Sequence, residues 1–254
     1  PISAKALLVS APLLSLQDLS VTFRGDSVQT RAVRNLSLDI DSGETVALVG
    51  ESGSGKSVSA LASLGLLPDN ADQGGGIFWK GAEIDHGDAA AMRRLRGNEI
   101  GMIFQEPMTS LNPLHTIEKQ IGESLRQHQG MSVEAARART LDLLHRVGIP
   151  GAETRLASYP HELSGGQRQR VMIAMALANN PDMLIADEPT TALDVTIEAQ
   201  ILDLLADLKR AEGLSMLFIT HDLGVVRQIA DRVFVMRQGE LVESGDAAVG
   251  RAHV

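Results

Sequence analysis

The fold is decided by the stretch Gly50-Glu51-Ser52-Gly53-Ser54-Gly55-Lys56-Ser57. It satisfies the pattern Gly-x-x-x-x-Gly-Lys-(Ser/Thr), which is typical of a loop that cradles phosphate groups. Residues 46–49 before it are an apolar run that predicts a buried strand, and residues 57–67 after it predict a helix in which Gly65 is the one breaker. Because the motif requires a strand before it and a helix after it, we favour a phosphate-binding loop over a glycine-rich turn without a ligand.

The residue types of this loop explain why it would bind phosphate. Glycines allow the backbone to curl so that its N–H groups face the phosphates, and the N-terminus of the following helix adds partial positive charge. Lys56 is expected to reach the β- and γ-phosphates of a nucleotide, and Ser57 is expected to bind Mg²⁺. The predicted nucleotide contacts in this region are Gly50, Ser52, Gly53, Ser54, Gly55, Lys56, Ser57 and Val58.

A second apolar run, residues 183–186, predicts a strand that ends in Asp187 and Glu188. Two acids after a strand, taken alone, are more often a solvated turn, but the phosphate-binding loop elsewhere in the chain reverses that preference. A carboxylate at the tip of such a strand can hold Mg²⁺ through water, and the next one can orient or deprotonate an attacking water. We therefore assign Asp187 to Mg²⁺ and Glu188 to the water.

The segments before the loop have the pattern of antiparallel strands. Apolar and polar residues alternate over residues 19–23 and again over residues 36–40, and turn residues follow each run at 24–26 and 41–43. Near the other end of the chain, residues 233–242 predict a hairpin around Gln238-Gly239. Both patterns indicate antiparallel strands that pair with their neighbours in the sequence.

Residues 106–180 have a different character. Prolines interrupt the start of this segment, and Ser132 is expected to cap a helix with Leu141, Leu144 and Val147 on one face. We interpret the segment as a mostly helical insertion. After it, a helical pattern at 197–209 separates the run at 183–186 from another apolar run at 216–220, and this order of strand, helix and strand implies a parallel sheet.

Composition excludes several classes of protein. With 44% hydrophobic residues, the 254-residue chain can bury a core, and 23 Lys+Arg against 32 Asp+Glu give a net charge of −9, which argues against broad capture of nucleic acid. The absence of cysteine rules out disulfides and thiolate chemistry. No apolar run approaches the roughly 20 residues that span a bilayer, and residues 1–10 lack a signal-peptide layout, so we expect any membrane role to come through partners.

The stretch Leu163-Ser164-Gly165-Gly166-Gln167 has two interpretations. In an arbitrary protein it is a serine-capped helix with a flexible glycine pair. Here it resembles the signature of the ABC ATPase family, and the rest of the chain follows the order of that family. The order is the loop at Gly50, Gln105 after Ile103-Phe104, the signature at Leu163, the acids Asp187 and Glu188, Thr191-Ala192-Leu193-Asp194, and His221. The ordered set is far more specific than any one element.

The resemblance implies the fold and its division. The fold class is α/β, a P-loop NTPase core of the ABC ATPase type with a mixed or parallel sheet, an N-terminal antiparallel β subdomain and an inserted helical subdomain. Residues 1–105 are expected to hold the antiparallel subdomain and the loop, residues 106–180 the helical subdomain with the signature, and residues 181–254 the second part of the core.

The resemblance also implies roles, with ATP and Mg²⁺ as the cofactors. Gln105 is expected to sense Mg²⁺ and the water, and His221 to hydrogen-bond the γ-phosphate and position Glu188. The signature residues Ser164, Gly165, Gly166 and Gln167 are expected to contact ATP bound to an opposite protomer in a head-to-tail dimer, and Asp194 to communicate across that dimer. Phe23 either stacks on adenine or is a plain core residue, and the sequence leaves these two roles open.

Longer stretches resemble importers of dipeptides, oligopeptides and nickel: residues 104–113, Tyr159-Pro160-His161-Glu162 and residues 186–196. Within that set the chain is similar to the first half of double-ATPase subunits of the microcin C or peptide type. The segment with His-Pro-Tyr-Thr that usually follows the last hairpin in this group is missing before Val254. That departure suggests a truncated chain, and the similarity to double-ATPase subunits implies that the natural polypeptide continues into a second ATPase domain.

The resemblance thus predicts an ATPase that drives an importer of peptides. Its expected partners are a second ATPase domain, two transmembrane permease subunits and, indirectly, an extracytoplasmic binding protein, and its expected place is the cytoplasmic face of the inner membrane. No nucleic acid is expected as a partner. The alternative is an ABC ATPase that acts on nucleic acid or ribosomes, but only about a hundred residues separate loop and signature, too few for the coiled-coil arm of chromosome-type relatives.

Overall fold

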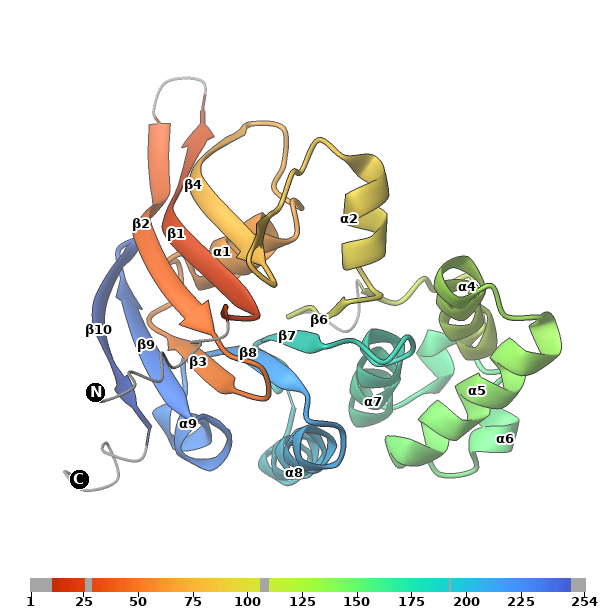
Figure 1. Cartoon of the computed structure of the whole chain (residues 1–254). Helices are drawn as coiled ribbons and strands as arrows, with labels where there is room; N and C mark the ends of the chain where they lie inside the picture. The colour runs from red at the N-terminus through yellow and green to blue at the C-terminus, as the bar shows by residue number, and fades with distance from the viewer. Residues whose placement is uncertain (1–10, 26–28, 106–109, 192, 248–254) are drawn as a thin grey trace, which may run out of the picture.

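The computed structural model describes residues 11–25, 29–105, 110–191 and 193–247, and Figure 1 labels its helices and strands. Several expectations concern residues outside this part of the chain. They are the missing signal peptide at residues 1–10, the turn residue Asp26, the domain boundary at residue 106, residues 106–109 of the importer-like stretch, Ala192 in the stretch before Asp194, and the end of the chain after residue 247.

The first of two sheets is antiparallel, with the strand order β2-β1-β4-β5. It consists of β1 (Leu14–Arg24), β2 (Gln29–Ile40), β4 (Ala71–Trp79) and β5 (Ala82–Glu83). The antiparallel pairing of β1 with β2 confirms the alternation in the sequence. Strand β4 was missed because three consecutive glycines, residues 74–76, hide its alternation.

The second sheet has the order β10-β9-β3-β8-β7-β6. Its strands are β3 (Thr45–Val49), β6 (Ile100–Ile103), β7 (Met183–Asp187), β8 (Ser215–Thr220), β9 (Arg232–Arg237) and β10 (Glu240–Asp246). Neighbouring strands from β9 to β6 run parallel, and β10 is antiparallel to β9, which confirms the expected hairpin. The α/β fold class with both kinds of sheet is therefore confirmed.

Both faces of the parallel sheet are covered, as its continuous apolar strands require. Met183 and Ile185 of β7 pack into a core shared with the antiparallel sheet, whereas Leu184 and Ala186 of the same strand pack into a core formed with helices. In Figure 1, α1 (Lys56–Ser63) lies on the side of the antiparallel sheet. The helices α8 (Val195–Glu212) and α9 (Leu223–Ile229) lie on the other side.

Helix α1 is shorter than the sequence predicted, because it ends at Ser63 and not at residue 67. Gly65 adopts a left-handed conformation with φ of +58°. Its N–H donates to the Ala62 carbonyl and the N–H of Leu66 donates to the Leu61 carbonyl, both at 2.9 Å. These two bonds form the turn with which glycine commonly ends a helix, so Gly65 acts as a terminator and not as a tolerated breaker.

The segment predicted to be helical contains four helices and a 3₁₀ turn within its described residues. They are α4 (Ile117–Gln129), α5 (Val133–Arg146), α6 (Ala152–Arg155), the turn at Pro160–Glu162 and α7 (Gly165–Ala176). Ser132 caps α5, as predicted, by accepting a hydrogen bond from the backbone N–H of Ala135 at 3.2 Å. A further helix, α2 (Ala89–Leu95), lies before β6. In Figure 1, α4 to α7 form a group beside the open edge of the parallel sheet at β6.

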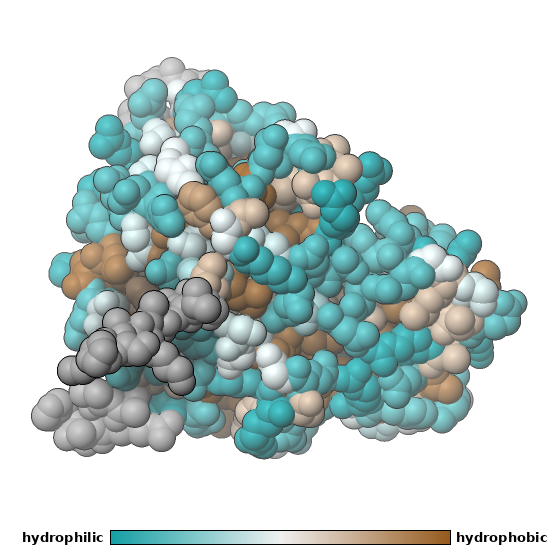
Figure 2. All heavy atoms as spheres, in the orientation of Figure 1, coloured by the Kyte–Doolittle hydropathy of each residue, from teal (hydrophilic) through white to brown (hydrophobic). Residues whose placement is uncertain are grey.

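Hydrophilic residues predominate on the face of the molecule in Figure 2, and apolar residues form small separate areas there. Within the described residues, no helix combines the length and the apolar character that a membrane span needs.

Candidate active site

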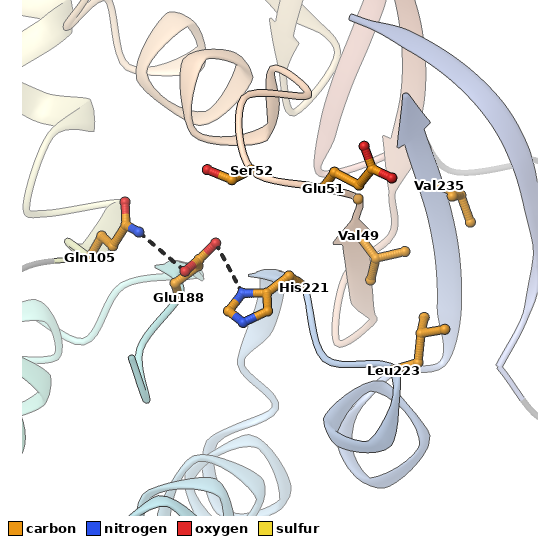
Figure 3. Close-up of a pocket in the computed structure, with 9 residues that line it drawn as sticks. Val49, Glu51, Ser52, Gln105, Glu188, His221, Leu223 and Val235 are labelled. Carbon is orange, nitrogen blue, oxygen red and sulfur yellow. Dashed lines mark hydrogen bonds and ion pairs between the residues drawn. The ribbon is translucent and has the colours of Figure 1, made fainter. Parts of the chain in front are cut away.

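A cavity of about 550 Å³ opens at the carboxyl ends of the parallel strands, between the end of β3 and the ends of β7 and β8. Figure 3 shows side chains from separate parts of the chain around it. The residues that line it are Val49, Gly50, Glu51, Ser52, Gln105, Glu188, His221, Leu223 and Val235. Ligands of open α/β sheets bind at this edge, because the loops that follow the strands converge there.

The loop 50–55 has the compact path that the motif predicts. Gly55 has φ of +104°, and a Cβ atom at this position would lie 2.4 Å from the carbonyl oxygen of Ala32 in β2. No side chain fits at such a distance, so the glycine lets the loop pass directly beneath the antiparallel sheet. Helix α1 begins with the next residue, Lys56, and its N-terminus therefore faces the loop.

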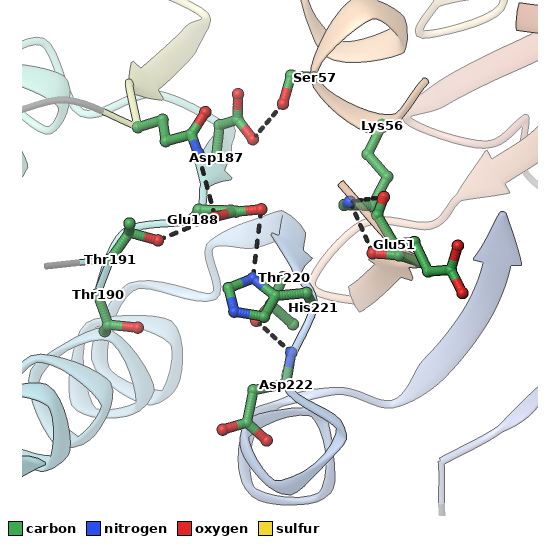
Figure 4. A network of polar contacts seen from close by, with 12 residues as sticks. Glu51, Lys56, Ser57, Asp187, Glu188, Thr190, Thr191, Thr220, His221 and Asp222 are labelled. Carbon is green, nitrogen blue, oxygen red and sulfur yellow. Dashed lines mark hydrogen bonds and ion pairs between the residues drawn. The ribbon is translucent and has the colours of Figure 1, made fainter. Parts of the chain in front are cut away.

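Lys56 is almost completely buried, with 4% of its surface exposed. Its Nζ donates to the backbone carbonyls of Gly50 at 2.8 Å and Glu51 at 3.0 Å, so the ammonium group spans the loop from within (Figure 4). Burial lowers the pKa of Lys56, while the negative charges of Glu188 and Asp187 oppose that shift. The site thus holds a desolvated cation beside two carboxylates.

Ser57 and Asp187 connect the loop to the sheet. The Ser57 hydroxyl donates to Oδ1 of Asp187 at 2.9 Å, and Asp187 is only 5% exposed at the end of β7 (Figure 4). Burial raises the pKa of Asp187, and the Ser57 hydrogen bond acts in the opposite direction. A half-buried hydroxyl in contact with a buried carboxylate supplies the hard oxygen donors that Mg²⁺ prefers.

Glu188 lies at the centre of a hydrogen-bonded set. Its Oε2 accepts from Nε2 of Gln105 at 3.1 Å and from the hydroxyl of Thr191 at 2.9 Å, and its Oε1 lies 3.4 Å from Nδ1 of His221. The Glu188 side chain is 11% exposed, whereas His221 is 63% exposed at the mouth of the cavity. Thr191 belongs to the same loop as Glu188, whereas Gln105 and His221 come from two other loops, so the orientation of the carboxylate depends on the assembled site (Figures 3 and 4).

The backbone of Glu188 is strained, with φ of +45° in the left-handed region. A non-glycine residue there costs of the order of 1 kcal/mol, and such strain persists only where surrounding contacts hold it. One such contact is the N–H of Glu188, which donates to the carbonyl of Ile219 on β8 at 2.9 Å. Asp187 is the last residue of β7, and the left-handed turn at the next residue directs the side chain of Glu188 into the cavity.

Mg²⁺ fits the donor set of Ser57 and Asp187. The described residues contain no group of three or more His, Cys, Asp or Glu side chains that could hold a metal by themselves. A magnesium ion at this place would therefore take most of its ligands from phosphate and water, as it does at many nucleotide sites.

Comparison with known proteins gives the family of the chain. A family model described as ABC transporter matches residues 33–191. The chain belongs to the ABC transporter family. It is 62% identical over 236 residues to the peptidoglycan transport ATP-binding protein YejF of Agrobacterium fabrum, covering 92% of this chain and 43% of that protein. It is 52% identical over 235 residues to the oligopeptide transport ATP-binding protein OppD of Bacillus subtilis, covering 92% of this chain and 66% of that protein.

A solved structure agrees with this result. The dimeric ATP-binding cassette MJ0796, in a post-hydrolysis state bound to ADP and Pi, superposes with a TM-score of 0.81 at 31% identity, covering 92% of this chain and 98% of that one. The chain spans less than half of the first relative above and about two thirds of the second.

The residues of the ABC signature do not line the cavity. Ser164 caps α7 by accepting from the N–H of Gln167 at 3.3 Å, and the Gln167 side chain accepts from the N–H of Ser164 at 3.0 Å. Gly165 and Gly166 form the first turn of that helix. The serine-capped helix that the sequence offered as an alternative is thus present, and it exposes a helix N-terminus at the surface.

Other predicted residues also lie outside the cavity lining: Gly53, Ser54, Gly55, Lys56, Ser57 and Asp187, which adjoin it, and Asp194, Phe23 and Val58. Asp194 caps α8 by accepting from the N–H of Ile197 at 2.9 Å. Phe23 in β1 and Val58 in α1 are half-buried against the core between the two sheets. The core role that the sequence offered for Phe23 is therefore present, and its stacking on adenine stays a prediction.

Two features of the site were missed by the sequence interpretation. Thr191 stands in the quoted stretch but received no role, although it contacts Glu188 directly. Ser54 was predicted as one loop contact among many, but its burial was not predicted: the residue is 3% exposed, and its hydroxyl is one of the buried polar groups without a hydrogen-bond partner within the described residues. An unpaired polar atom inside a loop of this type is suited to a ligand.

Replacement of Ser54 by alanine should leave the free energy of unfolding of the nucleotide-free protein within about 0.5 kcal/mol of wild type, because the hydroxyl has no bond to lose. Ser59 is the matched control. It is also buried, but its hydroxyl donates to the carbonyl of Gly55 at 3.0 Å, so Ser59→Ala should destabilise by about 1 kcal/mol. Urea unfolding measures both values, and a larger loss for Ser54→Ala than for Ser59→Ala would contradict the assignment.

Proposed function

We propose that this chain binds Mg·ATP in the cavity and hydrolyses it. The observation that carries the proposal is the position of Glu188, a carboxylate held by Gln105, Thr191 and His221 on the side of the cavity that faces the phosphate-binding loop. A carboxylate placed in this way can accept a proton from water next to a bound triphosphate.

The loop residues bind and orient the phosphates. The N–H groups at the start of α1 and the ammonium group of Lys56 supply fixed positive charge. On binding, the Lys56 ammonium would exchange its bonds to the carbonyls of Gly50 and Glu51 for phosphate oxygens. Ser57 and Asp187 would hold Mg²⁺, which neutralises charge on the β- and γ-phosphates.

Glu188 acts as the general base, and the side chains that contact its carboxylate fix its orientation. Gln105 and Thr191 both donate to Oε2, so that oxygen is occupied and Oε1 is the one available to water. His221 lies beside Oε1 and is exposed to the cavity mouth, where it can contact both the water and a terminal phosphate. We therefore propose positioning roles for Gln105, Thr191 and His221, and proton transfer for Glu188.

We further propose that the complete site is formed between two such domains. Ser164 and Gly166 lie at the N-terminus of α7, a place suited to an anion, yet they do not line the cavity of their own chain. A second protomer placed head to tail would bring this helix end to the γ-phosphate. The dimeric state named for the related ATP-binding cassette supports this arrangement.

The transport role rests on the relatives. Their names specify peptidoglycan and oligopeptide transport, which supports an importer of peptides driven by this domain through permease subunits at the cytoplasmic face of the membrane. The alternative, action on nucleic acid or ribosomes, is disfavoured by the net charge of −9. ATPase activity stimulated by DNA or ribosomes, and not by co-expressed permease subunits, would favour that alternative.

Replacement of Glu188 by glutamine should lower kcat for ATP at least about 100-fold while changing the Kd for Mg·ATP by less than about threefold, because the amide keeps the size and hydrogen bonds but accepts no proton. Phosphate release and calorimetry measure the two quantities. Glu243→Gln, a change at an exposed position of β10, is the control and should behave as wild type. Normal turnover by Glu188→Gln would move the base elsewhere.

Mixing two inactive variants tests the shared site. Lys56→Ala removes the loop cation, and Ser164→Asp keeps a cap for α7 but places a negative charge where the γ-phosphate of the opposite protomer would lie. Each variant alone should be inactive. An equal mixture should regain about a quarter of wild-type activity, because half of the dimers are then mixed and each has one intact site. A mixture that stays inactive at concentrations where the wild type is active would contradict the head-to-tail dimer.

A further inference from the structure

Arg96 contacts the backbone directly after the C-terminus of α1, the helix that follows the phosphate-binding loop. Its Nε donates to the carbonyl of Leu64 and its Nη2 to the carbonyl of Gly65, both at 2.6 Å. These carbonyls directly follow Ser63, the last residue of α1. Leu64 and Gly65 form the turn directly after the helix, near the negative end of its dipole, so a planar fork of two charged N–H donors can bind both carbonyls at once.

The turn at this helix end is shaped to receive the guanidinium group. A Cβ atom on Gly65 would lie 2.9 Å from Nη2 of Arg96 and 3.1 Å from the imidazole ring of His86. The absence of a side chain at residue 65 therefore allows the arginine to reach the backbone. The guanidinium group of Arg96 therefore packs directly against the backbone of the turn at Gly65.

Arg96 is itself held next to the strand that leads to Gln105. Its backbone N–H donates to the carbonyl of Met92 in α2 at 2.9 Å, and it forms an isolated bridge with Ile100. Ile100 begins β6, which pairs with β7 and ends at Ile103. Gln105 follows this strand and donates to Glu188. One side chain thus links the P-loop helix to the element that positions the base.

We propose that Arg96 is a positioning residue for the ATPase reaction, which fixes the P-loop helix relative to β6 and so sets Lys56 and Ser57 at a defined distance from Gln105 and Glu188. Helix α1 has only eight residues, so a displacement at its C-terminus is passed on to its N-terminus. Lysine cannot replace this residue fully, since a single ammonium group does not match two neighbouring carbonyls as a guanidinium does. The inference rests on the proposed function.

The variants Arg96→Ala and Arg96→Lys test this role, and Arg93→Ala is the matched control. Arg93 is an exposed arginine on α2 whose replacement removes the same charge. Arg96→Ala should raise the Kd for Mg·ATP and the KM by roughly tenfold at a temperature where circular dichroism shows a folded protein, because the loop is no longer held in its binding geometry. Arg96→Lys should recover part of the loss, and Arg93→Ala should match wild type.

Hydrogen–deuterium exchange of the nucleotide-free proteins supplies a readout that does not depend on ATP. Amides of α1 and of the loop should exchange faster in Arg96→Ala than in Arg93→Ala. If Arg96→Ala fails to fold, the comparison is made with Arg96→Lys, which keeps the charge.

The two proposals fail in different ways. If the wild type binds Mg·ATP and the Arg96 variants change Kd and KM less than twofold, the positioning role is wrong and the proposed function stands. A lowered thermal stability with unchanged Kd would reduce Arg96 to a helix cap and overturn it as well. A wild-type protein that binds no Mg·ATP would overturn the proposed function, and with it the role of Arg96 in the reaction.

Discussion

The structure depends on bringing one buried cation and two carboxylates to the same edge of a sheet. Ionised groups lose hydration when they are buried, and each alone would be strongly destabilising. Burial lowers the pKa of Lys56, and the charges of Glu188 and Asp187 oppose that shift. Burial raises the pKa of Asp187; the Ser57 hydrogen bond and the charge of Lys56 oppose that shift, whereas the like charge of Glu188 adds to it. The cluster is tolerated because every member also has hydrogen-bond partners.

The strand order explains how residues distant in sequence meet there. Strand β8 lies between β3, which leads into the loop, and β7, which ends in the acids. His221 follows β8 and Gln105 follows β6, so parallel strands deliver all four loops to one edge. The helical segment between β6 and β7 then extends from this edge and carries α7, whose N-terminus remains available for a second domain (Figure 1).

The sequence was informative where chemistry restricts the residue type. The loop, the two acids and the buried strands were predicted because glycine, lysine and continuous apolar runs admit few other interpretations. Local sequence patterns did not predict the contacts between side chains that are distant in the sequence. The contact of Arg96 with the turn after α1 joins residues 31 apart in sequence, and the contact of Gln105 with Glu188 joins residues 83 apart. Capping by Ser164 and Asp194 follows from local sequence, whereas their proposed contacts to another protomer are not visible within one chain.

The central claim is that the cation of the buried cluster is the main anchor of a bound triphosphate. Calorimetric titration of Mg·ATP into Lys56→Ala and into Lys119→Ala, a change of an exposed lysine on α4, tests it most directly. We expect wild-type affinity for Lys119→Ala. For Lys56→Ala we expect a loss of at least about 100-fold with the fold intact by circular dichroism, since the triphosphate would lose its desolvated ion pair. Near-native affinity of folded Lys56→Ala would contradict it.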